Sequence, residues 1–282
     1  MFSKQYICLV AGLHEYTIDS DAKGLNLAAL LEEIYDDLSK SDAVSVRLLY
    51  GYYDCENIAA AYASRSSFNP LGQLSKESVA AIVAGDESGE ENPLELLPES
   101  VVRVVEAYTS KEAKSDLMET SQSFDRALFT AYYEACAVSK SRLLREWSEA
   151  DRNLRNVAAA ITARGASRPV EDVVVGDGGV VDQLVKSSAA DFGLRGELSY
   201  IDAVIGAVSD EPNLIEKERR IDLVRWDVVE ELMEGEYFSI DYILGYLVKV
   251  NIVARWRSLD LERGREMFAK LMSELSGKDL IK

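Results

Sequence analysis

Two stretches of this chain, about one hundred residues apart, carry the same pattern. Residues 57–61 read Asn-Ile-Ala-Ala-Ala and residues 156–160 read Asn-Val-Ala-Ala-Ala, followed by Arg65 and Pro70 in the first stretch and by Arg164 and Pro169 in the second. All seven positions are offset by 99 residues (156 − 57). Alanine is common in helices, but the matching Asn, Arg and Pro in the same register predict an internal repeat.

A third copy is expected another 99 residues on, near residue 255. The helix that the sequence predicts from Ser239 to about Arg257 occupies this position, although it lacks the Asn-x-Ala-Ala-Ala pattern. The length of 282 residues fits three units of 94. We therefore expect one domain over residues 1–282, with approximate internal units 1–95, 96–190 and 191–282.

Helical periodicity dominates the sequence. From Leu143 to Ile161 the apolar residues recur in alternating steps of four and three, as on one face of a helix. The pattern begins near Phe124 and ends at Gly165, which predicts about forty helical residues, a rod of roughly 60 Å unless it kinks. Residues 173–185 form either a hairpin or a loop before a short helix, and residues 6–10 are the other candidate strand. The predicted fold class is mainly α.

Several helices have recognisable ends. Ser75 is the expected N-cap of a helix that ends at Gly85, with Leu74 and Val79 as a hydrophobic staple. Ser239 is expected to cap another helix, with Phe238 and Ile243 as the staple. Pro98 is expected at the first position of a helix through Val101, Val105 and Tyr108, and Asp260 is expected to cap a helix that reaches Gly277. Residues 85–93 are expected to form an acidic loop.

Composition excludes several classes of protein. The formal charge of −18 (31 − 49) disfavours binding to nucleic acid and to anionic lipid surfaces, because both need a basic face. No apolar run is long enough to span a bilayer, and the short apolar segment from Tyr6 to Leu13 lacks the features of a signal peptide. Three widely spaced cysteines (Cys8, Cys55 and Cys136) indicate free thiols in a reducing compartment. A cytoplasmic protein is expected.

Residue types that carry catalysis are scarce. His14 is the single histidine, so the two-histidine zinc and di-iron patterns are excluded, and a surface position or a satisfied core position is the favoured interpretation. Residues 176–179 (Gly-Asp-Gly-Gly) resemble a phosphate loop only weakly, because an acidic residue lies among the glycines, and a plain turn is favoured. No Ca²⁺-loop pattern occurs. We expect no catalytic, cofactor-binding or metal-binding residue, and no bound cofactor.

Arginines cluster around the second copy of the repeat. Two interpretations stay open: ion pairs that join helices, or a basic patch that docks the carboxylates of a partner. The candidate interface comprises Arg142, Arg145, Arg152, Arg155 and Arg168, with Arg164 beside them, and a second set comprises Arg255, Arg257, Arg263 and Arg265. Within the repeat, we expect Asn57 and Asn156 to bond a neighbouring helix across the alanines, and Arg65 and Arg164 to cap helix carbonyls.

One segment resembles a known family. Residues 147–156 (Trp-Ser-Glu-Ala-Asp-Arg-Asn-Leu-Arg-Asn), continuing to Ala163 and Arg164, resemble the central repeat of the C subunit of V-type and A-type ATPases, which eukaryotes call the d subunit. Residues 238–256 resemble the last repeat of that family. The whole chain more closely resembles an uncharacterised bacterial family that accompanies V-type ATPase genes. Residues 6–13 depart from the typical C-subunit sequence, because they lack its arginine-rich opening helix.

This resemblance implies a fold and a function. Proteins of the C-subunit family consist of three related helical units that form a funnel-shaped cup, in agreement with the 99-residue offset. The resemblance implies a non-catalytic central-stalk subunit, which acts as a socket that couples the rotary shaft to the membrane proteolipid ring during ion transport. The implied partners are the shaft subunits and the ring, with no nucleic acid, no small-molecule substrate and no membrane insertion. The implied location is the inner face of the cell membrane, reached through the ATPase complex.

Two alternatives from other classes stay open. The chain could be an acidic α-helical adaptor or scaffold unrelated to the ATPase, as its charge and helicity allow. It could also be an enzyme that uses clustered carboxylates on a helical bundle, which would require a bound metal.

Overall fold

A computed structural model of the chain describes residues 4–19, 24–85, 92–109, 123–209 and 213–258. These residues form eleven α-helices and two short 3₁₀ helices, with no β-strand among them, so the mainly α prediction is confirmed. The elements are α1 Ile7–Gly12, α2 Leu27–Asp37, α3 Lys40–Tyr62, α4 Lys76–Ala84, η1 Pro93–Leu96, α5 Glu99–Thr109, α6 Phe124–Ala137, α7 Arg142–Gly165, η4 Val170–Asp172, α8 Gly179–Lys186, α9 Ile201–Ser209, α10 Leu214–Met233 and α11 Ile240–Ser258.

Three pairs of consecutive helices organise the described part of the chain: α2 with α3, α6 with α7, and α10 with α11. A serine begins the second helix of each pair by accepting a hydrogen bond from the backbone N–H three residues later. The distances are 3.2 Å from Asp42 to Ser39, 3.0 Å from Leu144 to Ser141, and 3.3 Å from Tyr242 to Ser239. The three serines therefore mark the same structural position, which agrees with a repeated unit.

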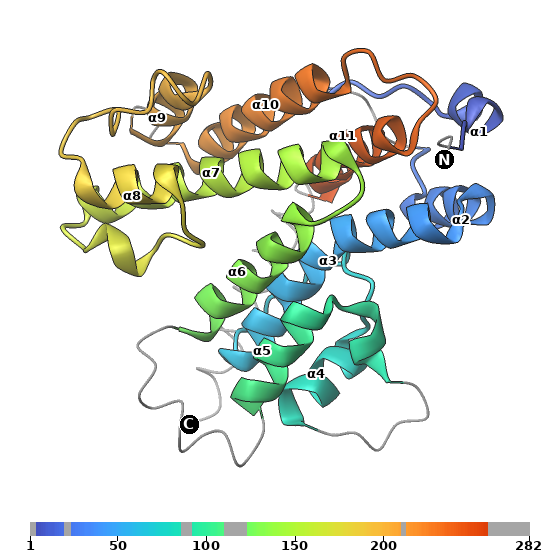
Figure 1. The fold of residues 1–282 in the computed structure, drawn as a ribbon, viewed down its shortest axis with the longest axis horizontal. Helices are drawn as coiled ribbons and strands as arrows, with labels where there is room; N and C mark the ends of the chain where they lie inside the picture. Colours follow the sequence, from blue (N-terminus) through green and yellow to red (C-terminus); the bar gives the residue numbers. More distant parts are fainter. Residues whose placement is uncertain (1–3, 20–23, 86–91, 110–122, 210–212, 259–282) are drawn as a thin grey trace, which may run out of the picture.

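Three long helices, α3, α7 and α10, each join one hydrophobic core to another. A shared core contains α1, α2, α11 and the N-terminal halves of α3 and α7, together with the C-terminal half of α10. The C-terminal half of α3 continues into a second core with α4, α5 and α6. The C-terminal half of α7 continues into a third core with α8, α9 and α10. Figure 1 shows this divergence: α3 and α6 descend to α4 and α5, whereas α7 extends sideways to α8 and α9.

The predicted rod over residues 124–165 is wrong, because α6 ends at Ala137 and α7 starts at Arg142. Ser141 captures the N–H of Leu144 and so opens a new helix. The guanidinium of Arg145 donates to the carbonyls of Ser139 at 2.6 Å and Ser141 at 3.1 Å, which stabilises the break. The two helices then pack against each other in place of a continuous rod.

The candidate strand at residues 6–10 is also wrong. Residues 7–12 form α1, in which the N–H of Val10 donates to the carbonyl of Tyr6 at 2.9 Å. Tyr6 itself donates its N–H to the carbonyl of Phe238 at 2.7 Å, so the segment attaches to the chain without forming a strand. For residues 173–185, the loop before a short helix is confirmed, since α8 begins at Gly179.

The predicted helix ends agree with the structure apart from small shifts. Ser75 caps α4, and Gly85 ends it in the left-handed conformation at φ 67°. Ser239 caps α11 as predicted. Pro98 precedes the first residue of α5 instead of occupying it. Of the predicted acidic loop, residues 86–91 lie outside the described residues, and η1 begins at Pro93. The predicted last helix, from Asp260 to Gly277, also lies outside the described residues.

The two repeated asparagines perform the same structural task, which differs from the predicted one. Asn57 accepts from the N–H of Asn69 at 2.6 Å and donates to its carbonyl at 3.0 Å. Asn156 does the same to Val175, at 2.8 Å and 2.9 Å. Each side chain thus clamps the loop that follows its own helix and does not bond a neighbouring helix. The repeat is therefore visible at the level of individual hydrogen bonds.

The repeated arginines diverge. The N–H of Arg65 donates to the carbonyl of Ala60 at 2.8 Å, and Arg168, not Arg164, makes the equivalent bond to Ala163 at 2.8 Å. This end of the two helices is therefore offset by 103 residues (168 − 65), one helical turn more than the asparagines. Arg65 pairs with Asp125 at 3.0 Å, so its predicted role as a helix cap is wrong.

Arg164 makes a different set of contacts. Its guanidinium donates to the carbonyl of Ala189 at 2.8 Å and to that of Ser187, the C-cap of α8. The same group stacks on the ring of Phe192, 3.7 Å from its centroid. Arg164 therefore satisfies carbonyls at the end of α8 and in the loop beyond it, as the sequence predicted in general terms.

Gly72 lies against the clamp of the first unit, the side chain of Asn57 that holds the backbone of Asn69, and this contact leads to a stability prediction. A Cβ at this position would lie 2.7 Å from Asn57 Nδ2 and 2.8 Å from Asp54 Oδ1, and both side chains are buried. We expect Gly72→Ala to destabilise the protein by about 1 to 3 kcal/mol, because these groups must shift. Thermal unfolding measures the effect. Gly12→Ala is the control, since a Cβ there meets no atom within 4 Å, and an equal loss in both variants would contradict the prediction.

Within the described ranges, no helix is both long enough and apolar enough to cross a membrane.

Candidate functional site

A central cavity of about 1140 Å³ lies where the long helices diverge. Its walls come from α3, α6, α7, α10 and α11, so it touches all three helix pairs. The asparagine of the first clamp, Asn57, lies in this wall, as does Asn251 on α11. Because each wall belongs to a different part of the sequence, tertiary packing alone creates this cavity.

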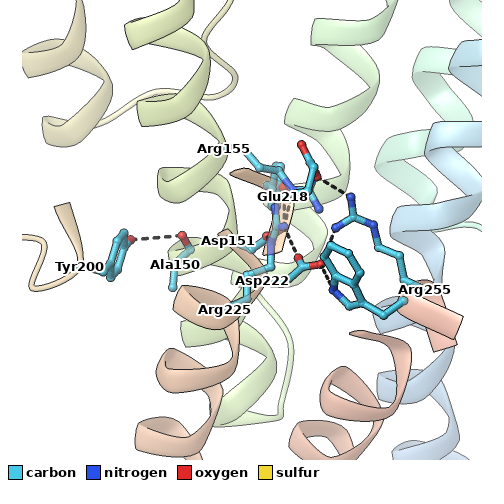
Figure 2. Close-up of polar contacts among 10 residues, drawn as sticks. Ala150, Asp151, Arg155, Tyr200, Glu218, Asp222, Arg225 and Arg255 are labelled. Atoms are coloured by element: carbon cyan, nitrogen blue, oxygen red, sulfur yellow. Dashed lines mark hydrogen bonds and ion pairs between the residues drawn. The ribbon is translucent and has the colours of Figure 1, made fainter. Parts of the chain in front are cut away.

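A buried carboxylate joins two arginines at the cavity wall. Asp151 and Arg155 lie one turn apart on α7, and Arg155 Nε donates to Asp151 Oδ2 at 2.7 Å. Arg225 on α10 donates through Nε to the other oxygen of Asp151 at 2.9 Å. The Asp151 side chain is only 8% exposed, so little water screens its interaction with the two guanidinium groups. Figure 2 shows these side chains converging between the two helices.

A second carboxylate extends this network to α11. Asp222 accepts from Arg225 at 2.8 Å through one oxygen and from Arg255 at 2.5 Å through the other. The indole N–H of Trp256 donates to the same second oxygen at 3.0 Å. Arg255 also pairs with Glu218 on α10. Asp222 is 2% exposed, and it therefore links α10 to α11 while Asp151 links α10 to α7.

Aromatic side chains form the part of the cavity wall next to the ionic network. Tyr52 packs against Phe129 and Tyr132, with ring centroids 5.3 Å and 5.7 Å apart. The Arg155 guanidinium lies 4.2 Å from the centroid of the Tyr52 ring, a cation–π geometry that connects the aromatic side to the ionic network. Burial raises the pKa of the Tyr52 hydroxyl well above its usual value, although the charge of Arg155 opposes this shift.

The charges that line the cavity nearly balance, in contrast with the chain as a whole. The basic residues are Arg65, Arg155, Lys217, Arg225, Arg255 and Arg257, and the acidic residues are Glu56, Asp125, Asp151, Glu218 and Asp222. Counted over the described residues, the lining therefore carries a formal charge of +1 (6 − 5), whereas the whole chain carries −18. The lining can thus accept a neutral or acidic polypeptide without strong repulsion from its own charges.

The five arginines predicted as an interface do not form one patch. Arg155 lines the cavity, whereas Arg142 pairs with Glu146 at 2.7 Å and donates to the carbonyl of Leu232 at 2.9 Å. Arg145 binds carbonyls between α6 and α7. The Arg152 guanidinium lies against Gly176, and Arg168 is exposed beyond the end of α7. Their role toward a partner stays a prediction. Arg142 and Arg155 each pair with a carboxylate one turn away on α7, and Arg142 also pairs with Glu236 in the loop between α10 and α11, in line with the ion-pair interpretation.

The second arginine set divides in the same way. Arg255 belongs to the ionic network, and Arg257 donates to the carbonyl of Leu25 at 2.6 Å, next to α2. Arg263 and Arg265 lie outside the described residues. Sequence reasoning named Arg255 but missed its partner Asp222, as well as Arg225, which pairs with the same carboxylate. The i, i+3 spacing of Asp222 and Arg225 on one helix face was the available signal.

The histidine lies outside the cavity, and the two buried cysteines are unreactive. His14 is exposed on the segment after α1, where it contacts Tyr16. Burial raises the pKa of Cys136 to about 12 and raises the pKa of Cys55 as well, so both thiols stay protonated at neutral pH. In the described parts of the chain, no group of three His, Cys, Asp or Glu residues is arranged to hold a metal ion. The cavity offers ion pairing, aromatic contact and hydrogen bonding.

The ionic network predicts an acid-dependent stability. Burial tends to raise the pKa of Asp151, but the positive charges of Arg155 and Arg225 outweigh burial and lower it below its usual value. A carboxyl group with a lowered pKa in the folded state stabilises the protein above its unfolded pKa of about 3.9, and this contribution is lost as pH falls through the folded pKa. We therefore expect unfolding free energy to fall more steeply below about pH 4 in the wild type than in Asp151→Asn. Urea titrations from neutral to acidic pH measure this, and parallel slopes in the two proteins would contradict it.

Known proteins resemble this chain along nearly its full length. An uncharacterized protein of Chlamydia pneumoniae is 22% identical over 251 residues, which cover 86% of this chain and 88% of that protein. No solved structure matches the chain. The model of the family described as "Protein of unknown function (DUF2764)" matches residues 3–278. This chain therefore belongs to the DUF2764 family.

Proposed function

We propose that the protein is a non-catalytic central-stalk subunit of a V-type ATPase, which acts as a socket between the rotary shaft and the membrane proteolipid ring. The observation that carries this proposal is the central cavity, whose walls come from three helix pairs, two of which are joined by buried ion pairs. A socket that transmits torque must resist deformation, and close-packed helices joined by buried charges supply that stiffness. The sequence resemblance to the C subunit of these ATPases supplies the partners.

The proposed location follows from this role. The protein attaches to the inner face of the cell membrane through its partners, with the shaft entering the cavity and the ring on another face. Ion transport and nucleotide chemistry belong to other subunits, so this chain needs no cofactor. An acidic adaptor unrelated to the ATPase is the competing interpretation, and it predicts no association with either shaft or ring.

Co-purification tests the proposal. A tagged copy expressed from its own gene should bring down the shaft subunits and the proteolipid ring from detergent-solubilised membranes. Removal of the soluble head should leave the ring bound if the ring contact is direct. Recovery of the tagged protein as a monomer, without ATPase subunits, would contradict the proposal and favour the adaptor interpretation.

A cavity variant makes this test specific. Arg65 lines the cavity with a side chain that is 53% exposed, so Arg65→Glu changes the charge there with little effect on the core. We expect it to reduce recovery of the shaft by about tenfold, as reversal of a contact charge weakens binding. Lys186→Glu on α8, with a 71% exposed side chain outside the cavity, is the matched control. Equal recovery with both variants would place the shaft contact elsewhere.

A further inference from the structure

The charged residues that line the central cavity fall into two groups. Four arginines and four carboxylates are joined in ion pairs, and they are Arg65, Arg155, Arg225 and Arg255 with Asp125, Asp151, Glu218 and Asp222. The charged lining residues that remain, counted over the described part of the chain, are Glu56, Lys217 and Arg257. The charge of the lining that these ion pairs do not neutralise is therefore +1 (2 − 1).

Lys217 has no carboxylate partner among the residues that the structure describes. It is half-buried near the start of α10 and lines the cavity. Partners on one helix lie three or four positions apart, and for Lys217 these positions hold Asn213, Leu214, Arg220 and Ile221. The carboxylates next to it in the sequence, Glu216 and Glu218, are each paired with an arginine. The folded chain therefore leaves the Lys217 ammonium available to a ligand in the cavity.

The other two charges lie on different elements. Arg257, near the end of α11, donates to the carbonyl of Leu25 at 2.6 Å, a neutral acceptor that leaves its positive charge in place. Glu56 on α3 accepts from the side-chain amide of Asn69 at 2.8 Å, and its charge acts on Arg155. The excess positive charge therefore belongs to α10 and α11, while the remaining negative charge is held on α3.

Aromatic surface in the cavity comes from other elements than the two cations. Tyr52 and Tyr53 on α3 and Phe129 on α6 line the cavity, and each keeps part of its surface exposed. Aromatic rings favour contact with apolar groups and provide a large contact area. A ligand that matches this cavity offers apolar groups to α3 and α6 and negative charge to α10 and α11.

We propose that the central cavity binds the end of an acidic amphipathic helix of a partner protein. Its apolar face packs against Tyr52 and Phe129, and its carboxylates pair with Lys217 and Arg257. The cavity volume of about 1140 Å³ exceeds the range of about 300–1,000 Å³ for small-molecule sites, which favours a polypeptide. A helix about 11 Å across fills that volume with about two turns, so only its end fits.

The charge of the whole chain, −18, does not prevent this binding. At a salt concentration of about 0.15 M, charges more than about 8 Å apart are largely screened, so the groups in contact decide. The carboxylates of an acidic helix meet Lys217 and Arg257 without breaking any ion pair of the network. A basic helix would instead meet like charge at both residues, which disfavours it.

Under the proposed function the partner is the rotary shaft, and this identification alone rests on that proposal. The end of the shaft that enters the cavity then carries carboxylates beside apolar residues. The cavity chemistry is tested on the purified full-length protein, without any ATPase subunit. Failure of peptide binding and failure of co-purification are therefore separate results.

Two labelled helical peptides test the charge preference. Both carry the same leucine stripe at helical spacing, and they differ only on the polar face, which carries glutamate in one and glutamine in the other. We expect fluorescence anisotropy at about 0.15 M salt to show the glutamate peptide binding about tenfold more tightly than the glutamine peptide. Equal affinity for the two peptides, or no binding of the glutamate peptide, would overturn the proposal.

Charge variants locate the preference. Lys217→Gln should reduce the tenfold preference, and Lys217→Glu should abolish it, because the cation that pairs with the peptide is lost and then reversed. Circular dichroism checks that both variants fold. Lys140→Glu is the control, since Lys140 is exposed between α6 and α7 and does not line the cavity, and it should keep the full preference. A preference that survives Lys217→Glu in the folded protein would contradict the assigned contact.

Cross-linking tests the contact directly. A carbodiimide condenses a carboxylate and an amine that touch each other into an amide, so it should join the glutamate peptide to Lys217. Peptide mapping by mass spectrometry identifies the joined lysine. Cross-linking at Lys217 and not at Lys140 supports the proposal, whereas equal cross-linking at both lysines, or none at Lys217, overturns it.

Discussion

Replacement of Asp222 by alanine is expected to lower the free energy of unfolding by about 3 to 5 kcal/mol, the cost of removing one partner from a buried ion pair. Asp222 is 2% exposed and accepts hydrogen bonds from Arg225, Arg255 and Trp256. Arg225 is only 11% exposed, so it would keep a buried charge with one of its two carboxylates missing. Urea denaturation followed by circular dichroism measures the change.

Two comparisons isolate the charge effect. Asp222→Asn keeps the volume and one acceptor oxygen, so we expect a smaller loss than with alanine. Asp182→Ala removes the partner of Lys186 at an exposed pair on α8, where both side chains are more than half exposed. Because water screens that pair, the loss should stay below about 1 kcal/mol. If Asp222→Ala were no more destabilising than Asp182→Ala, the network would not brace the three helices.

The second large effect is expected at the clamp of the second unit. Asn156 is 2% exposed, and its side chain satisfies both the N–H and the carbonyl of Val175. Asn156→Ala leaves two backbone groups without these partners, at about 1 to 3 kcal/mol each when buried, so we expect a loss of about 2 to 4 kcal/mol. Hydrogen exchange should in addition show faster exchange of the Val175 amide than of amides in α3.

Asn156→Asp is the matched variant. The carboxylate can still accept from the N–H of Val175, but it cannot donate to the carbonyl, so we expect exchange at Val175 to change less than in Asn156→Ala. The corresponding change Asn57→Ala should act on Asn69 in the first unit and leave Val175 unchanged. Equal acceleration at both loops by either variant would indicate general unfolding in place of two separate clamps.

Local signals in the sequence predicted local structure well. Ser75 and Ser239 start helices as their capping patterns indicated, and Gly85 ends one because glycine tolerates a positive φ. The errors lie where a local pattern had two outcomes. The apolar spacing of a helix continues through residues 124–165, but the chain leaves the helix after Ala137 and Ser141 starts a new one. Apolar spacing alone does not reveal a single break of this kind. Residues 6–10 have a strand-like composition, and lacking a strand partner they form part of α1 and the residue before it.

The candidate site was less predictable. The sequence pointed to Arg155 and Arg255 as part of arginine clusters, whereas Asp151, Asp222 and Arg225 became prominent only in three dimensions. Asp151 and Asp222 are 71 residues apart (222 − 151), and no spacing rule connects them. The 99-residue repeat likewise located both asparagines but not their targets, since Asn69 and Val175 follow at different distances, 12 and 19 residues.

The sequence alone therefore determined that the chain is helical, that two asparagines share one role in a repeated unit, and where α4, α5 and α11 begin. These features depend on residues a few positions apart, whose energies act within one helix or one turn. The tertiary structure alone decided which faces meet, and with them the central cavity, its balanced charge and its ionic network. Those features depend on contacts between α3, α7, α10 and α11, because burial turns ordinary surface charges into strong mutual constraints only when packing removes water around them.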